Sequence, residues 1–65
     1  MIVEVQCFRT DHGIQLVFHN DEHLADVFEF SSQADIDYVM SLIRIQVPAE
    51  TLLVEARDRA QTTVH

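Results

Sequence analysis

The chain has 65 residues, with 11 Asp or Glu against 4 Lys or Arg, and its formal net charge at pH 7 is -7. Hydrophobic residues still make up 48% of it, which is typical of a folded domain rather than of a disordered acidic segment. No lysine occurs. This balance disfavours DNA, RNA and anionic lipid as direct ligands and favours a protein partner with a basic surface.

The length allows one small domain, residues 1–65. A chain of this size buries only roughly 60% of the surface that its unfolded form exposes. One such core rarely supplies more than ~3–5 kcal/mol without disulfides, metal or oligomerisation. Cys7 is the single cysteine, so no internal disulfide can form, and a homodimer or an obligate complex is expected. The lone cysteine, the lack of a secretory signal pattern and the lack of a long apolar run predict a cytoplasmic protein without membrane contact.

The N-terminal part of the chain predicts a β-hairpin. Residues 2–9 and 14–19 each show the two-residue alternation of apolar and polar side chains that is typical of strands. The only glycine, Gly13, lies between them. Glycine adopts a positive φ without steric cost, so we place a tight turn at His12-Gly13.

This turn predicts the register of the hairpin. It pairs Cys7 with Phe18 and Arg9 with Leu16. The pairing gathers one apolar face that suits burial: Val3, Val5, Cys7, Ile14, Leu16 and Phe18. The side chain of Cys7 is then expected in the core, as a small hydrophobic group.

A third strand is predicted at residues 24–30, after a polar turn at residues 20–23, and its orientation is left open. In one arrangement Phe28 and Phe30 face the core, and Asp26 on the same face needs a partner or an edge position. In the other, Ala25 and Val27 face the core. The outer face of the sheet then carries an apolar patch, which usually marks a contact site. The members of this candidate apolar interface are Phe8, Val17, Phe28 and Phe30.

A helix is predicted to begin after Ser32. The Ser32 hydroxyl can cap the first free N–H groups, and Asp35 occupies the capping-box position three residues later. Apolar residues then recur at helical spacing, at Ile36, Val39, Met40, Ile43 and Val47. Asp35 and Asp37 are expected away from this face. The helix should end before Pro48.

A second helix is predicted from residue 49, with Glu50 in its acidic first turn and Glu55 and Arg59 as an i,i+4 ion pair. The alternative is a strand at residues 51–54. Ala, Glu and Arg dominate residues 50–61 and favour the helix, and residues 61–65 are expected to be frayed. The fold class is therefore α+β: a three-stranded antiparallel sheet (a meander), one helix packed on it, and a second C-terminal helix (βββαα).

No motif in the chain indicates catalysis. His12, His19 and His23 lie near the predicted turns, and His19 and His23 are potential metal ligands. A structural zinc site normally has four ligands, often cysteines, so we expect these histidines to hold no metal. Phosphate loops, nucleophile elbows and zinc-protease motifs do not occur. The expectation is a non-enzymatic protein with no catalytic residue, metal or other cofactor.

The carboxylates offer the sharper functional hypothesis. Six of them are expected to form a continuous acidic edge: Asp21, Glu22, Asp26, Glu29, Asp35 and Asp37. Such an edge can mimic a phosphate backbone and compete for the basic groove of a nucleic-acid-binding protein. This favours a small acidic binding protein that inhibits or regulates a larger basic partner.

Two other interpretations stay open. The acidic surface can simply be a solvated one that keeps the protein soluble. Alternatively, the chain is a structural or assembly subunit that acts through apolar contacts of the sheet or of residues 52–54. An assembly subunit would form a homodimer or an obligate complex.

Overall fold

A computed structural model describes residues 1–22 and 25–62. β1 (Ile2–Arg9), β2 (Ile14–Asn20) and β3 (Ala25–Phe30) form one antiparallel sheet in the order β1-β2-β3. Two helices follow, α1 (Gln33–Arg44) and α2 (Ala49–Thr62). The predicted βββαα arrangement is therefore confirmed, and the C-terminal third is a helix rather than a strand.

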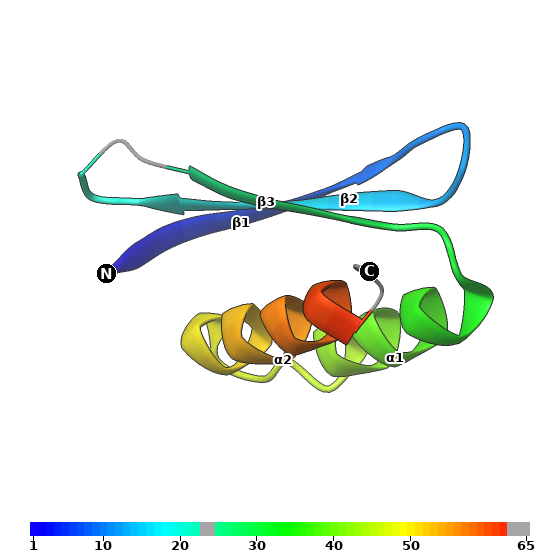
Figure 1. The fold of residues 1–65 in the computed structure, drawn as a ribbon. Helices are drawn as coiled ribbons and strands as arrows, with labels where there is room; N and C mark the ends of the chain where they lie inside the picture. Colours follow the sequence, from blue (N-terminus) through cyan, green and yellow to red (C-terminus); the bar gives the residue numbers. More distant parts are fainter. Residues whose placement is uncertain (23–24, 63–65) are drawn as a thin grey trace.

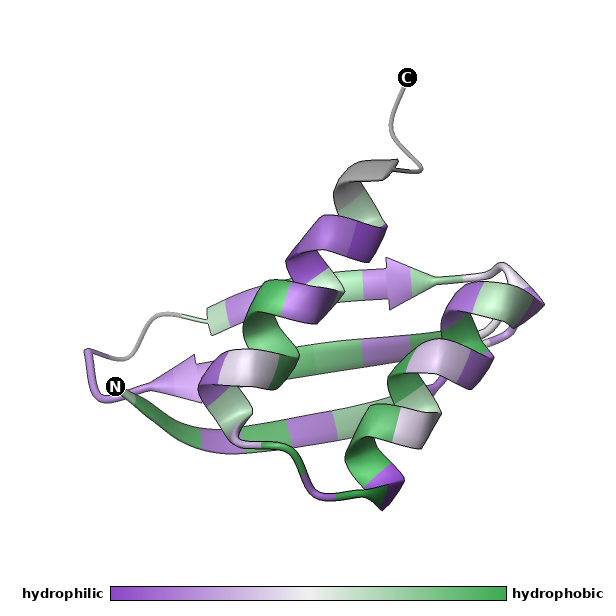
Figure 2. Ribbon diagram, turned by 90° about the horizontal axis from the view of Figure 1, so that it is seen from below, coloured by the Kyte–Doolittle hydropathy of each residue, from purple (hydrophilic) through white to green (hydrophobic). Residues whose placement is uncertain are grey.

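The molecule has two layers, with both helices under the same face of the sheet (Figure 1). In Figure 2, which is seen from the helix side, the helices cross the strands obliquely. The strands behind them alternate between apolar and polar residues. The described residues place no element on the other face, which we call the outer face. Within the described ranges, neither helix has the length and hydrophobicity needed to cross a membrane.

The core lies between the sheet and the helices. Its buried hydrophobic side chains come from β2, β3 and both helices: Leu16, Phe18, Phe30, Val39, Leu52 and Ala56. Phe18 meets Phe28 edge to face, with 5.9 Å between the ring centroids, a geometry that aromatic pairs prefer. Cys7 is exposed, so the prediction that it lies in the core is wrong. It sits on edge strand β1 and lines a shallow apolar cavity of about 220 Å³ beside the helices.

The β1–β2 hairpin turns one residue earlier than predicted. Cys7 pairs with Leu16 and not with Phe18, and Arg9 pairs with Ile14. The predicted partners are therefore wrong by two residues. A shift of two residues keeps every side chain on the same face of the sheet. The predicted apolar face of β2 is therefore still the one that faces the core.

Gly13 serves a close approach and not a positive φ. Its φ lies outside the left-handed region, so the conformational reason given for this glycine is wrong. The Thr10 N–H donates to the Gly13 carbonyl at 2.8 Å, and the Gly13 N–H donates to Thr10 Oγ1 at 3.0 Å. A Cβ on Gly13 would lie 2.0 Å from the carbonyl oxygen of Phe30. The glycine therefore lets the hairpin loop pass directly against the end of β3.

An irregularity in β1 reverses its alternation near the N-terminus. Ile2 pairs with Asn20 and Glu4 pairs with His19, so Val3 forms a bulge. Ile2 consequently packs against the core, whereas Val3 is 60% exposed. The prediction that Val3 belongs to the buried face is wrong for this reason.

The orientation of β3 is the first of the two predicted arrangements. Phe28 pairs with Leu16 and Phe30 pairs with Ile14, so both phenylalanines face the helices. Asp26 shares their face and is exposed, because β3 is an edge strand. For this arrangement we expected Asp26 to need either a partner or an edge position, and the structure gives it the edge position.

The first turn of α1 differs from the predicted cap. Ser32 is the N-cap residue, and its carbonyl accepts a hydrogen bond from the Ile36 N–H at 2.9 Å. Its hydroxyl makes no capping hydrogen bond, so that part of the prediction is wrong. Asp35 lies in the first turn, as predicted, but it is a buried residue and not a solvent-exposed one.

The end of α1 is a Schellman motif. The Gln46 N–H donates to the Ile43 carbonyl at 3.0 Å, and the Val47 N–H donates to the Leu42 carbonyl at 3.3 Å. Gln46 has a φ of 61°, a left-handed conformation that glycine usually adopts at this position. This motif ends the helix before Pro48, as predicted. α2 continues through Thr62, and residues 63–65 of the predicted frayed tail lie outside the described residues.

Candidate partner-binding surface

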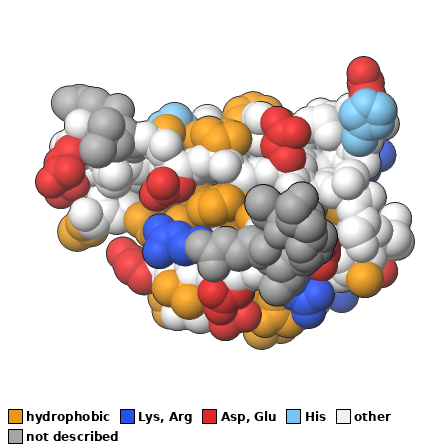
Figure 3. Space-filling view, viewed as in Figure 1, with side chains coloured by type: hydrophobic (Ala, Val, Ile, Leu, Met, Phe, Trp, Pro, Cys, Tyr) orange, Lys and Arg blue, Asp and Glu red, His pale blue; other side chains and the backbone are white. Residues whose placement is uncertain are grey.

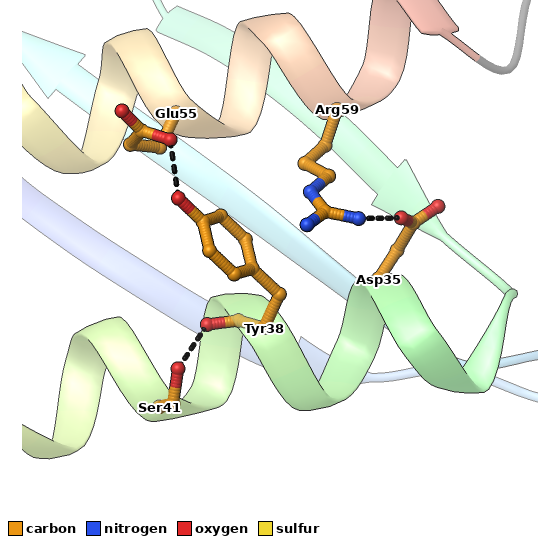
Figure 4. Close-up of polar contacts among 5 residues, drawn as sticks. All are labelled: Asp35, Tyr38, Ser41, Glu55 and Arg59. Carbon is orange, nitrogen blue, oxygen red and sulfur yellow. Dashed lines mark hydrogen bonds and ion pairs between the residues drawn. The ribbon is translucent and has the colours of Figure 1, made fainter.

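Four polar side chains connect the two helices (Figure 4). Arg59 Nη1 donates to Asp35 Oδ1 at 3.0 Å. The Arg59 guanidinium also lies 4.1 Å from the centroid of the Tyr38 ring, a cation–π contact. The Tyr38 hydroxyl donates to Glu55. Ser41, one turn further along α1, donates to the Tyr38 carbonyl at 2.6 Å.

This interhelical cluster forms a structural clamp between α1 and α2. The hydrogen bond to Glu55 raises the pKa of Tyr38 above 10.0, and desolvation and the Glu55 charge raise it further. A raised pKa disfavours the phenolate that a base or nucleophile would need. In the described part of the chain, no buried side-chain nitrogen or oxygen lacks a hydrogen-bond partner.

The clamp removes Asp35 from the predicted acidic edge. Asp35 is only 7% exposed, and Arg59 lies against its carboxylate. Its expected position on the polar side of the helix is wrong, because α2 packs over the first turn of α1. The i,i+4 spacing predicted Glu55 as the partner of Arg59. The contact of Arg59 with Asp35 joins residues 24 positions apart, and no local pattern in the sequence predicts it.

The other five carboxylates of the predicted edge are exposed. Asp21 Oδ1 lies 3.3 Å from the N-terminal ammonium. Glu22, in the same turn, donates its backbone N–H to Asn20 Oδ1 at 2.9 Å. Asp37 on α1 accepts a hydrogen bond from Gln33 at 2.8 Å. In the view of Figure 3, acidic side chains occur in separate groups along the sheet and on the helices.

β3 carries two of these carboxylates on opposite faces. Asp26 is paired with Phe18 and belongs to the helix-facing side, while Glu29 is paired with Gln15 on the outer face and accepts its side-chain hydrogen bond at 3.2 Å. Together with the turn that precedes the strand they form a set that we call the β3 acidic edge: Asp21, Glu22, Asp26 and Glu29.

The sequence around the β3 acidic edge has many acidic residues and no lysine or arginine. Residues 10–43 contain neither lysine nor arginine. The acidic residues of that stretch are Asp11, Asp21, Glu22, Asp26, Glu29, Asp35 and Asp37. Only Asp35 and Asp21 have a cationic partner among the described residues. The turn and β3 are thus a locally acidic surface, and the four predicted carboxylates that lie there are exposed.

The candidate apolar interface does not form one patch. Phe8 and Val17 lie on the outer face, whereas Phe28 and Phe30 face the helices. The outer face instead adds Val27, which pairs with Val17 and is 50% exposed; Phe8 is 46% exposed. The sequence missed Val27 in this role because its position depended on the unresolved orientation of β3.

The histidines do not assemble a ligand set among the described residues. His19 Nε2 lies 3.0 Å from Gln6 Oε1 on the outer face, and His12 is exposed in the β1–β2 loop. His23 lies outside the described residues. Where the structure describes the chain, no three His, Cys, Asp or Glu side chains come together as a group able to hold a metal ion.

An open cleft of about 500 Å³ lies at the C-terminal end of β3. Its lining residues come from the β1–β2 loop and from the end of β3: Thr10, His12, Glu29, Phe30 and Ser31. Its lining combines the carboxylate of Glu29 and the hydroxyl groups of Thr10 and Ser31 with the imidazole of His12. Carboxylate and hydroxyl oxygens are hydrogen-bond acceptors suited to a cation.

The chain was compared with protein-family models, with curated proteins and with solved structures, and none of the three comparisons finds a match.

Proposed function

We propose that this chain is a small non-enzymatic binding protein that engages the basic surface of a larger protein and regulates it. The observation that carries the proposal is the β3 acidic edge, an exposed run of carboxylates in a stretch without lysine or arginine. Complementary charge steers association and suppresses partners of the wrong sign. Exposed charges are screened by salt, with a Debye length of about 8 Å at physiological ionic strength, so the interaction should be sensitive to salt.

The partner class that fits best is a nucleic-acid-binding protein. The groove of such a protein is lined by lysine and arginine that neutralise phosphates. A surface with several exposed carboxylates can occupy the same groove, and it would then act by mimicry. The three exposed carboxylates without a cationic partner in this edge, Glu22, Asp26 and Glu29, are the residues expected to meet the basic groove.

A capture experiment tests this proposal. The protein is immobilised, exposed to nuclease-treated native lysate, and eluted with rising salt. The proposal expects a basic protein that elutes at moderate salt and that the D26N/E29Q variant does not retain. Retention of the same protein by that variant would remove the acidic edge from the proposal.

The outer face supports a second candidate, an assembly subunit that acts through apolar contacts. Phe8 and Val27 are each about half exposed there, on a sheet face that the described helices leave open. This function predicts a homodimer that resists salt and that Phe8→Glu dissociates. Phe28 is unsuitable for this test because it packs against the core. A monomer by light scattering at high protein concentration would eliminate the homodimer version.

A further inference from the structure

We propose that the partner contributes an extended, arginine- or lysine-bearing segment that adds to the free edge of β3 as a fourth strand. This inference rests on the proposed function and names the form of the partner's contact. It follows from the backbone of β3, from the charge on both of its faces, and from the cleft at its end.

The backbone of β3 offers an unpaired edge. In the described sheet β3 has one neighbour, β2. The hydrogen bond from Thr10 to Gly13 sets the phase of the hairpin ladder, and hydrogen-bonded pairs alternate along antiparallel strands. This phase directs the backbone groups of Phe28 toward β2 and those of Val27 and Glu29 outward. In the turns and loops that the structure describes, no backbone group bonds to Val27 or Glu29.

The side chains of β3 select the charge of the added strand. Asp26 and Glu29 lie on opposite faces of it, so a strand added at the edge has a carboxylate on each side. Opposite charges on directly paired residues stabilise a sheet, and like charges destabilise it. Two copies that met at β3 would bring no positive side chain to the edge, because β3 carries Asp26 and Glu29 and neither Lys nor Arg. The edge therefore favours a basic segment over a second copy of this chain.

The cleft at the end of β3 supplies a place for one side chain of that segment. Glu29 lines it together with Thr10, Ser31 and His12. A guanidinium has five donors in a planar fork and makes strong hydrogen bonds to a carboxylate. An arginine that follows the line of β3 would enter the cleft and meet Glu29. The edge strand β1 lacks this selectivity, because it carries both Glu4 and Arg9.

Binding of a synthetic peptide, observed by NMR on the full ¹⁵N-labelled chain, tests the proposal. The probe alternates arginine and valine, and a matched peptide has the same sequence with N-methyl groups on alternate backbone nitrogens. N-methylation keeps the charge but removes the donors that strand pairing needs. The proposal expects shifts centred on β3, slowed amide exchange at Val27 and Glu29, and about a tenfold loss of affinity for the methylated peptide, since each hydrogen bond contributes about 0.5–1.5 kcal/mol.

Protein variants give an independent comparison. Val27→Pro removes an outward N–H and leaves the bonds to β2, since proline is tolerated on edge strands; Val27→Thr keeps the N–H. The proline variant should lose peptide binding and the threonine variant should keep it. Equal affinity for both peptides, or no binding of the arginine–valine peptide, would overturn strand addition. A basic partner captured in a salt-sensitive way would still support the proposed function in that case, so the two failures are distinguishable.

Discussion

Asp35 on α1 and Arg59 on α2 are joined by an ion pair at 3.0 Å, between a carboxylate in the first turn of one helix and a guanidinium near the end of the other. The Asp35 side chain is largely buried, and the Arg59 side chain is about one-third exposed. The same guanidinium covers the Tyr38 ring. The pair therefore fixes the C-terminal half of α2 against α1, which holds both helices under the sheet.

Removing this ion pair should destabilise the fold. We expect Asp35→Asn to lower the free energy of unfolding by about 1–2 kcal/mol, between the values for exposed and buried charged hydrogen bonds. Urea titration followed by circular dichroism measures it. Asp37→Asn makes the same charge change at an exposed position of α1 and should change stability by less than about 0.5 kcal/mol. Equal effects of the two substitutions would contradict the clamp.

Tyr38 should titrate above its ordinary value. It is the only tyrosine, so the ultraviolet absorbance of the phenolate reports it directly. Its folded pKa is raised above 10.0, chiefly by the hydrogen bond to Glu55. The stabilisation from this group is therefore fully present below pH 10 and is lost as the pH rises through the folded pKa. Glu55→Gln removes the neighbouring negative charge and should lower the midpoint; an unchanged midpoint would contradict the contact.

Gly13 should tolerate no side chain, whatever its φ preference. Gly13→Ala brings a Cβ within 2.0 Å of the Phe30 carbonyl oxygen, and we expect a loss of about 1–3 kcal/mol, as for other overpacked sites. Gly13→Asn separates the two explanations, because asparagine accepts a positive φ more readily than alanine does. The steric account predicts that both variants are destabilised alike in thermal unfolding. Rescue by asparagine would restore the conformational explanation.

Gln46 is a position where a substitution should stabilise the chain. Its φ of 61° costs an L-residue about 1–2 kcal/mol relative to glycine. Part of that gain is offset by the larger entropy of glycine in the unfolded chain. We expect Gln46→Gly to raise the free energy of unfolding by about 0.5–1 kcal/mol, whereas Gln46→Ala should not raise it. A glycine variant no more stable than the alanine variant would argue against the left-handed cap.

Local patterns in the sequence were sufficient for the elements of this fold. The period-two alternation of residues 2–9 and 14–19 and the helical spacing from Ile36 to Ile43 depend only on which face of each element is buried. The bounds of β1 agree with the predicted strand, and Pro48 correctly marked the end of the first helix region. The orientation of β3 was harder to predict from the sequence, because its two faces carry similar numbers of apolar residues. Packing against the helices decides it.

Contacts between distant residues account for the errors. The burial of Asp35 depends on Arg59 in another helix, and the need for Gly13 depends on the carbonyl of Phe30. Neither relationship has a periodicity or a spacing that a single sequence reveals. The turn position was misjudged because glycine was read as a residue of positive φ. The carboxylates of the β3 acidic edge are exposed, and exposure of a charged side chain needs no tertiary contact to predict it.

The most direct test of the account measures the affinity of the captured partner over a range of salt concentrations for three proteins. These are the wild type, the D26N/E29Q variant, and a control variant, E50Q/D58N, that removes the same charge from exposed positions of α2. We predict that the β3 variant binds more weakly and with a shallower salt dependence, while the control retains most of the wild-type affinity. Equal losses in both variants, or none in the β3 variant, would contradict the β3 acidic edge as the binding surface.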